Sequence, residues 1–251
     1  MLELNKIWHG DCLELMKDIP DGSIDFCCTD LPYGITACHW DKKIDLQKFW
    51  QQVNRVCKFD AAVALFSQMP FGAELIMSNK KNFHYEWIWK KNIGVGFLNA
   101  KKMPLRTHEN ILIFYRKLPI YNPQFTQGKP YKYKRRGFSY NYGNQETGKS
   151  SENPDGKRYP VDVLRVNTVY TSAEKQLHST QKPVDLIEYL IKTYTNEGET
   201  VLDCCMGSGT TAIAAINTNR KFIGFELDEH FFKVATERIN KRIAEKESEL
   251  F

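Results

Sequence analysis

Short apolar runs alternate with amphipathic segments along most of the chain. The apolar runs are rich in β-branched, aromatic or cysteine residues and predict buried strands at 24–29, 61–66, 83–89, 111–115, 200–202 and 222–225. Apolar residues at helical spacing predict helices at 13–19, 45–58, 70–78, 183–191, 210–218 and from about 228 to 245. This alternation predicts an α/β fold, a doubly wound and mostly parallel sheet covered by helices on both faces.

The pattern changes after Arg116, where no helical or strand period continues. Residues 117–149 hold seven lysines or arginines, seven aromatic residues and Glu146 as the single acid. Basic and aromatic residues mixed in a loop-rich segment suit contacts to phosphates and stacking on bases. A solvated loop has a similar composition. We expect residues 117–175 to form a loop-rich basic insert between two parts, 1–116 and 176–251, of one domain.

Composition, net charge and cysteine content indicate the class of protein but not its activity. The 251 residues are 42% hydrophobic, enough for a full core, and the net charge of +5 is only mildly basic. Seven cysteines without a CxxC spacing support neither a disulfide framework nor a metal site, and a reducing cytosol suits them best. No leader-like or membrane-length apolar run occurs, so the expectation is a cytoplasmic protein that makes no membrane contact.

The stretch Asp30-Leu31-Pro32-Tyr33 directly follows the strand predicted at 24–29. Proline ends ladder pairing and keeps Leu31 out of helical angles, which frees nearby carbonyls to face a cleft. Asp30 and a carbonyl of Leu31 or Pro32 can accept the two protons of an exocyclic amine while Tyr33 stacks on the ring. Four residues do not settle this, because an aspartate that caps a turn before proline is common.

A strand, glycine turn, helix, strand and acid follow one another near the C-terminal end. Asp203 ends the first strand, Gly207-Ser208-Gly209 forms the turn, and Glu226 ends the second strand. Such turns bring the backbone close to a ligand, and the final acid can bind ribose hydroxyls. The third glycine of a dinucleotide fingerprint is missing, which disfavours a nicotinamide site. No Gly-Lys-Ser or Gly-Lys-Thr follows, so the turn is not a P-loop.

Four motifs in this order resemble S-adenosylmethionine-dependent DNA amino-methyltransferases of the β group. They occupy residues 30–33, 178–183, 203–211 and 224–226. Segments 87–91, 98–104, 108–110 and 121–124 resemble the prophage and orphan adenine-specific members, so the likeness covers nearly the whole chain outside the insert. It implies a Rossmann-like methyltransferase fold and direct methyl transfer to adenine N6 of a flipped-out base in duplex DNA.

The resemblance also implies a role for individual residues. Asp30, Leu31, Pro32 and Tyr33 would hold the target base and its amine. The cofactor S-adenosylmethionine would be bound by Asp11, Cys12, Asp30, His178, Thr180, Gln181, Lys182, Asp203, Cys205, Gly207, Ser208, Gly209, Thr210 and Glu226. Contacts to double-stranded DNA are expected from Lys101, Lys102, Arg106, Lys132, Lys134, Arg135 and Arg136. The chain departs from the family pattern where Leu31 replaces a proline and Cys205 replaces a phenylalanine.

Several alternatives remain open from the sequence. Cytosine N4 offers the same kind of amine, and an intact grip motif also occurs in glutamine methyltransferases, although there the glycine motif comes first. A catalytically inactive DNA-binding protein could keep the fold. Cys204 and Cys205 suit a core better than nucleophilic chemistry, and Trp87 and Trp89 suit strand packing. The recognised DNA sequence, a homodimer and a cognate restriction nuclease are left undecided.

Overall fold

The computed structural model describes residues 2–34, 43–134, 150–169, 177 and 180–249. The chain forms two compact units. The main unit comprises Met1–Asn122 and Asp162–Phe251, and the insert unit comprises Pro123–Val161. Among the described residues, no helix combines the length and apolar character that a membrane span requires.

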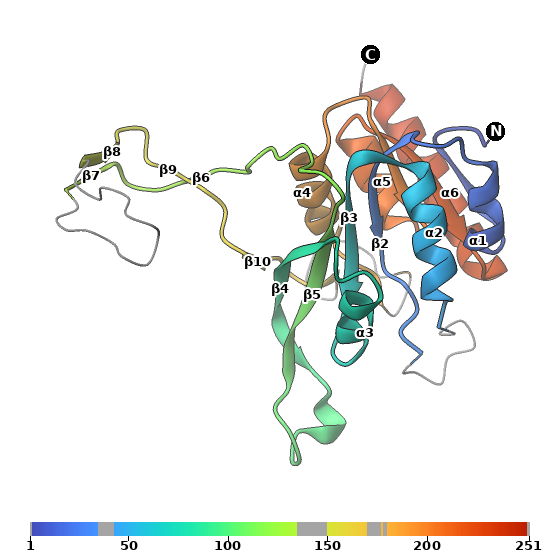
Figure 1. Cartoon of the computed structure of the whole chain (residues 1–251), viewed down its shortest axis with the longest axis horizontal. Coiled ribbons are helices and arrows are strands. Elements are labelled where there is room, and N and C mark those ends of the chain that lie inside the picture. Colours follow the sequence, from blue (N-terminus) through green and yellow to red (C-terminus); the bar gives the residue numbers. More distant parts are fainter. Residues whose placement is uncertain (1, 35–42, 135–149, 170–176, 178–179, 250–251) are drawn as a thin grey trace. The chain divides into compact units, whose positions relative to one another are not determined.

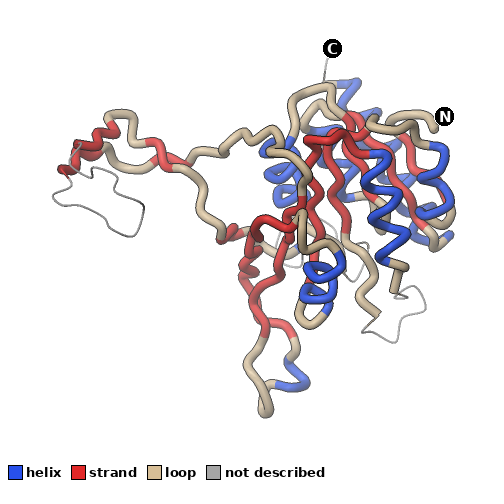
Figure 2. Tube along the Cα trace, viewed as in Figure 1, coloured by secondary structure: helices blue, strands red, loops and turns tan. Residues whose placement is uncertain are grey.

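The main unit is built on an eight-stranded sheet in the order β1-β12-β11-β2-β3-β5-β4-β10 (Figures 1 and 2). Pairs from β1 to β3 are parallel, β5 is antiparallel to both of its neighbours, and β10 is parallel to β4. The strands are β1 (Lys6–His9), β2 (Ile24–Thr29), β3 (Cys57–Ser67), β4 (Phe83–Val95), β5 (Arg106–Phe114), β10 (Val163–Arg165), β11 (Thr200–Asp203) and β12 (Lys221–Glu226).

Helices cover both faces of this sheet, as the alternating pattern predicts. One apolar cluster joins the sheet to the helices α1 (Cys12–Leu15), α2 (Leu46–Val56) and α3 (Phe71–Ser78), with the 3₁₀ helix η1 (Met16–Asp18) beside α1. The second cluster joins the opposite face to α4 (Val184–Tyr194), α5 (Thr210–Asn217) and α6 (Glu229–Ser248). The predicted α/β class with a doubly wound, mostly parallel sheet is confirmed.

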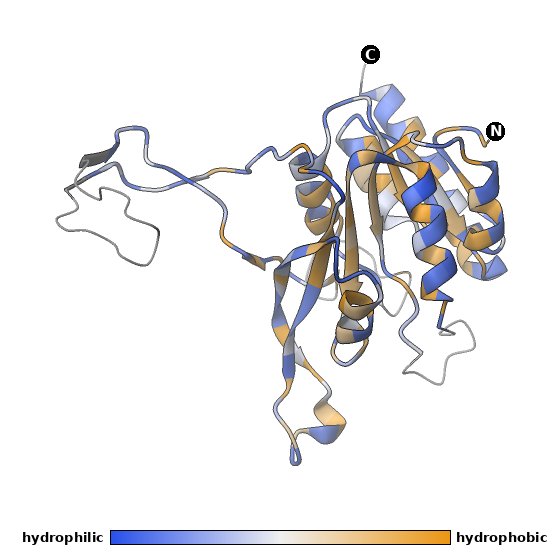
Figure 3. Ribbon diagram, viewed as in Figure 1, coloured by the Kyte–Doolittle hydropathy of each residue, from blue (hydrophilic) through white to orange (hydrophobic). Residues whose placement is uncertain are grey.

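Strand β2 shows why its sequence reads as a continuous apolar run. Phe26 and Cys28 pack into the cluster under α4 and α5, whereas Ile24 and Cys27 pack into the cluster under α1 and α2. A strand buried on both faces has no polar side to present, so alternation of apolar and polar residues is lost. In Figure 3 the central strands are mostly orange, whereas the covering helices show both orange and blue.

Some elements differ from their prediction. Strand β4 continues past Trp89 to Val95: its pairing with β5 shifts register after Lys90, and Val95 pairs with Arg106. The three-residue strand β10 is too short to give a hydrophobic period. The insert unit, predicted without strands, contains two antiparallel pairs: β6 (Thr126–Gln127) with β9 (Lys157–Arg158), and β7 (Tyr131–Lys134) with β8 (Ser150–Asn153).

Candidate active site at the carboxyl ends of the strands

A cavity of about 950 Å³ lies at the carboxyl ends of the parallel strands of the main unit. Four acids from four strand ends line it: Asp11, Asp30, Asp203 and Glu226. Strands β2 and β11 are neighbours, but the chain leads from β2 to β3 on one side and from β11 to β12 on the other. Such a switch point is where open α/β sheets bind ligands, and sites for nucleotide-sized ligands span roughly 300–1,000 Å³.

The predicted amine grip lies in this cavity, directly after β2. The Tyr33 hydroxyl donates a hydrogen bond of 2.7 Å to Asp30 Oδ1, and Lys182 Nζ forms an ion pair with Asp30 Oδ2. The Tyr33 ring packs against Phe71 with 5.1 Å between centroids. Leu31 is buried in the core, so its side chain anchors the segment where the family pattern has a proline. The carboxylate is therefore fixed through both of its oxygens.

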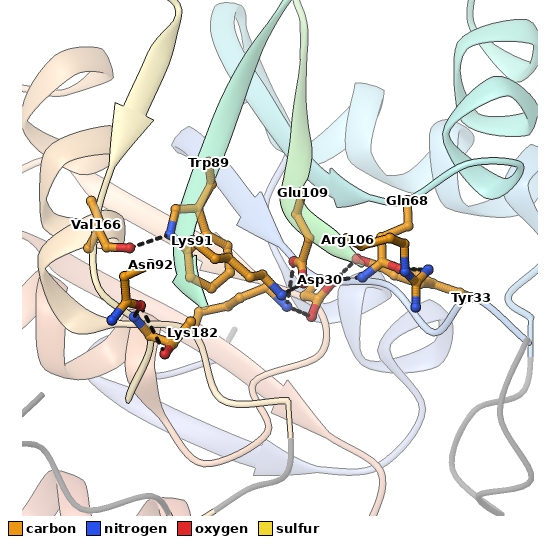
Figure 4. A network of polar contacts seen from close by, with 11 residues as sticks. Asp30, Tyr33, Gln68, Trp89, Lys91, Asn92, Arg106, Glu109, Val166 and Lys182 are labelled. Carbon is orange, nitrogen blue, oxygen red and sulfur yellow. Dashed lines mark hydrogen bonds and ion pairs between the residues drawn. The ribbon is translucent and has the colours of Figure 1, made fainter. Parts of the chain in front are cut away.

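Asp30 belongs to a cluster of four charged side chains (Figure 4). Glu109 Oε2 lies 3.4 Å from Lys182 Nζ, and Glu109 Oε1 lies 2.5 Å from Lys91 Nζ. Burial raises the pKa of Glu109, but the two ammonium groups outweigh it and hold that pKa at about 2. Burial lowers the pKa of Lys182, but Asp30 and Glu109 outweigh it and raise that pKa. Two carboxylates and two ammonium groups make the cluster electrically neutral.

Two further side chains extend this cluster toward solvent. Gln68 Nε2 donates to Glu109 Oε1 at 3.2 Å, and Arg106 donates to the Gln68 side-chain oxygen. Trp89 supplies the neighbouring wall, and its indole nitrogen donates to the Val166 carbonyl at 2.9 Å. A continuous set of contacts therefore joins the exposed Arg106 to Asp30 within the main unit.

Asp203 holds the glycine turn in shape. Its Oδ1 accepts from the Cys205 backbone nitrogen at 3.0 Å, and its Oδ2 accepts from the Thr211 hydroxyl at 2.6 Å. Burial raises the pKa of Asp203 to about 6 despite these donors. Gly209 caps α5 with φ +86°, a left-handed conformation that favours glycine, and it does not line the cavity.

Glu226, the last residue of β12, also binds the turn. Its Oε2 accepts from the Gly207 backbone nitrogen at 2.7 Å and its Oε1 accepts from the Asp228 backbone nitrogen at 2.8 Å. Burial raises the pKa of Glu226. Gly224, two residues earlier, leaves space for Met206, since an added Cβ would lie 2.0 Å from Met206 Cε. The acid and the turn are thus locked together by packing and by hydrogen bonds.

The remaining cofactor residues predicted from the sequence are distributed around the same wall. Asp11 caps α1 by accepting from the Leu13 backbone nitrogen at 2.8 Å. Gln181 accepts from the Leu177 backbone nitrogen at 2.7 Å. Residues that line the cavity also include Cys12, Thr180, Lys182, Cys205, Gly207, Ser208 and Thr210. His178 lies outside the described residues.

The cysteines and tryptophans near the site differ in how deeply they are buried. Cys204 is buried in the core, and the Cys12 and Cys27 thiols together with burial raise its pKa. Cys205 is only partly buried and lines the cavity. Trp87 and Trp89 are buried in the core, as expected of strand packing, and the Trp87 indole nitrogen donates to the Tyr194 hydroxyl at 2.7 Å.

The residues predicted to contact DNA fall into two groups. In the main unit, Lys101 and Lys102 are exposed in the β4–β5 hairpin, and Arg106 lines the cavity. In the insert unit, Lys132 forms an ion pair with Glu152, and Lys134 belongs to β7. Arg135 and Arg136 lie outside the described residues.

Aromatic residues of the insert unit contact its own cations. The Arg158 guanidinium lies 4.6 Å from the Tyr131 ring, and Lys157 Nζ lies 5.9 Å from the Phe125 ring. Phe125 also packs against Tyr159 with 4.9 Å between centroids. Basic and aromatic residues are therefore adjacent within this unit, as their interleaving in the sequence suggests.

Sequence reasoning assigned no role to Lys91, Glu109 and Gln68. Lys91 and Glu109 lie in segments 87–91 and 108–110, which carry part of the family resemblance, and this was the available signal for them. Their pairing with Lys182 has no local signature, because Glu109 and Lys182 are far apart in the chain. Lys182, which was expected to bind the cofactor, lines the cavity, and its ammonium group contacts Asp30 and Glu109.

Known proteins share this sequence pattern and fold. A family model described as DNA methylase (N6_N4_Mtase) matches residues 24–237. The chain is 30% identical to type II methyltransferase M.BglII of Bacillus subtilis, over 92% of this chain and 68% of the relative. It is 28% identical to type II methyltransferase M1.MboII of Moraxella bovis, over 96% and 98%. It is also 28% identical to DNA adenine methyltransferase YhdJ of Escherichia coli K12, over 95% and 83%.

Solved structures show the same fold at lower identity. The M1.HpyAVI–SAM complex gives a TM-score of 0.65 at 24% identity and covers 94% of this chain and 98% of that chain. The cytosine-N4-specific PvuII DNA methyltransferase gives a TM-score of 0.67 at 15% identity, with 94% and 90% covered. The Rossmann-like methyltransferase architecture expected from the sequence is confirmed.

Proposed function

The chain belongs to the N6_N4_Mtase family of DNA methylases, and from this premise we propose that it methylates adenine at N6 in duplex DNA. The family, and with it this chain, uses S-adenosylmethionine, whose sulfonium supplies the methyl group. DNA as substrate sets aside the glutamine methyltransferase alternative. The observation that carries the proposal is the Asp30 carboxylate, fixed by Tyr33 and Lys182 in the cavity that the glycine turn also lines.

The residues of this cavity fit the cofactor. Glu226 presents a carboxylate at the end of β12, in the position where nucleotide-binding sheets bind ribose hydroxyls. Gly207 and Ser208 bring backbone atoms to the cavity wall beside it, and Asp11 adds an acceptor from the end of β1. Asp203 would hold the turn in place for the methionine part, because both of its oxygens already bind the turn and the start of α5.

Asp30 would orient the amine for attack. A carboxylate offers about four lone-pair positions, so donors from Tyr33 and Lys182 leave room for the amine proton. With a proton held by Asp30, the amine lone pair turns out of conjugation with the ring. It then forms the N–C bond while the C–S bond breaks and leaves its electron pair on sulfur, and the nitrogen releases one proton to solvent. Rate enhancement comes from positioning and from negative charge next to a nitrogen that becomes positive.

Duplex DNA hides the adenine amine inside the base stack. The target base must therefore leave the helix to reach Asp30, at a cost of a few kcal/mol. A cavity of about 950 Å³ is at the upper end of the range for ligand sites, which suits a cofactor together with a base. Adenine rather than cytosine is supported by an aspartate at position 30 and by the likeness to an enzyme named as a DNA adenine methyltransferase.

The proposal is tested by transfer of labelled methyl groups to DNA from a methylation-deficient bacterium. Wild-type protein is expected to label the DNA. Asp30→Ala should lose at least a thousandfold in turnover while it still binds S-adenosylmethionine, since one acid removed from a preorganised polar site costs roughly 10²–10³ and the amine also loses its position. Asp60→Ala, an exposed carboxylate on β3, is the matched control and should retain activity. Equal activity of both variants would refute the role of Asp30.

A further inference from the structure

The β4–β5 hairpin carries an apolar tip that belongs to neither core cluster of the described residues. Residues 96–105, called the hairpin tip below, include the 3₁₀ helix η2 (Phe97–Asn99). Phe97 is 78% exposed and Leu98 is 90% exposed, and Met103 and Leu105 are also exposed. Single exposed apolar residues are common on protein surfaces, but four within nine positions form a local patch that calls for a partner. The hairpin extends beyond the helices in Figure 1.

Charge identifies the kind of partner. No aspartate or glutamate occurs between Trp87 and Glu109, whereas Lys90, Lys101 and Lys102 are all exposed in this stretch. Apolar side chains flanked by cations, with no acid among them, complement a polyanion that also offers apolar surface. Duplex DNA has both properties, since phosphates flank a stack of bases. Self-association would instead bring these like charges together.

The tip also adjoins the catalytic cavity. Ile93, Val95 and Arg106 from the two hairpin strands line the cavity that contains Asp30. Phe97 follows Val95 by two residues, and a chain spans at most about 3.6 Å per residue, so the Cα atoms of these two residues lie within roughly 7 Å of each other. That distance corresponds to about two base-pair steps of DNA. The tip therefore begins within about two base-pair steps of the cavity wall, next to where a duplex with its target base in the cavity would lie.

We propose that the hairpin tip is a wedge that enters the DNA beside the flipped base. Phe97 and Leu98 fill the space left in the base stack, and Lys101 and Lys102 bind the adjacent phosphates. Apolar side chains of this kind are inserted between bases by proteins that unstack DNA, and filling the gap offsets part of the cost of unstacking. The inference rests on the proposed methyl transfer to a flipped base, and it assigns a DNA contact to the main unit apart from the insert unit.

The test uses a short duplex with one mapped methylation site, in two forms. In one form the target base is paired, and in the other it faces an abasic position and is already unpaired. Phe97→Ala/Leu98→Ala should lose roughly tenfold to a hundredfold in kcat/KM on the paired duplex, in line with the loss of one stacked aromatic contact. On the unpaired duplex the loss should be less than threefold. Met77→Ala/Leu118→Ala removes two exposed apolar side chains elsewhere and should match wild type on both.

Other outcomes would overturn either the wedge or the proposed function. No loss on the paired duplex, or an equal loss on both forms, overturns the wedge. A change in oligomeric state by light scattering, with kcat/KM unchanged, assigns the tip to a second copy of the chain and also overturns it. If wild-type protein methylates neither duplex, the proposed function itself fails. Binding of S-adenosylmethionine by the variant, measured by calorimetry, confirms that the main unit is folded, since the tip contributes nothing to either core cluster.

Discussion

Replacing Glu109 by glutamine is expected to destabilise the protein through the charge cluster beside Asp30. The change keeps the shape of the side chain but leaves the buried ammonium groups of Lys91 and Lys182 with one carboxylate between them. The folded protein lowers the pKa of Glu109 from 4.5 to about 2. At about 1.4 kcal/mol for each pKa unit, this corresponds to about 3 kcal/mol of stability near pH 7. Breaking a buried ion pair costs roughly 3–5 kcal/mol, which agrees.

Lowering the pH is expected to reduce the destabilisation caused by Glu109→Gln. Since the pKa of Glu109 is depressed in the folded state, its contribution is fully present above pH 4.5 and is lost as the pH falls toward 2. The gap in unfolding free energy between wild type and Glu109→Gln should therefore shrink to less than half between pH 7 and pH 3. Urea unfolding followed by circular dichroism measures this gap. At pH 7 the midpoint should fall by roughly 1 M, given a slope of about 3 kcal/mol/M for a chain of this size.

The control is Glu74→Gln, which removes a carboxylate whose ion pair with Lys43 is exposed. Exposed pairs contribute roughly 0–1 kcal/mol, so its midpoint should stay close to wild type. If Glu109→Gln and Glu74→Gln unfold at the same urea concentration, Glu109 does not compensate the two ammonium groups. A gap between wild type and Glu109→Gln that stays constant from pH 7 to pH 3 would refute the electrostatic explanation.

Three further changes test other parts of the site. Burial raises the pKa of Asp203 from 3.8 to about 6, so charging this carboxyl opposes folding. In urea unfolding, the free energy of unfolding of Asp203→Asn should therefore rise by about 3 kcal/mol relative to wild type between pH 3.5 and pH 8. A difference that stays constant over this pH range would contradict this. Glu226→Gln should weaken S-adenosylmethionine binding about tenfold to a hundredfold by calorimetry, whereas Glu237→Gln on the exposed side of α6 should not; equal affinities would remove Glu226 from the cofactor site. Gly224→Ala should lower the unfolding free energy by roughly 1–3 kcal/mol, and by less in a Met206→Ala background, since the added methyl meets Met206; an equal cost in both backgrounds would exclude that contact.

The layered fold was predictable because its strands are buried on both faces and its helices carry one apolar face. Runs such as 24–29 and 222–225 have few alternative environments, and Asp45 and Asp228 cap helices as their side chains suggest. The antiparallel direction of β5 was not predictable. Direction follows from which strands become neighbours, and nothing in the apolar run at 111–115 encodes that choice.

The site was predictable where chemistry lies within one segment. Asp30 and Tyr33 are three residues apart and lie together after β2, and Glu226 faces the glycine turn. The charge cluster was not predictable, because Lys182 and Asp30 are brought together only by the sheet and by the approach to α4. Lys182 was accordingly expected to bind the cofactor. Its observed partners follow from tertiary structure alone.

The most direct test of the central claim is mass spectrometry of nucleosides from DNA treated with the protein and methyl-deuterated S-adenosylmethionine. Deuterated N6-methyladenine from wild-type protein, absent with Asp30→Ala, is the predicted result. Deuterated N4-methylcytosine would keep the family and the Asp30 mechanism but contradict adenine as the target. No deuterium in the DNA, with S-adenosylmethionine binding intact, would contradict methyl transfer to DNA by this chain.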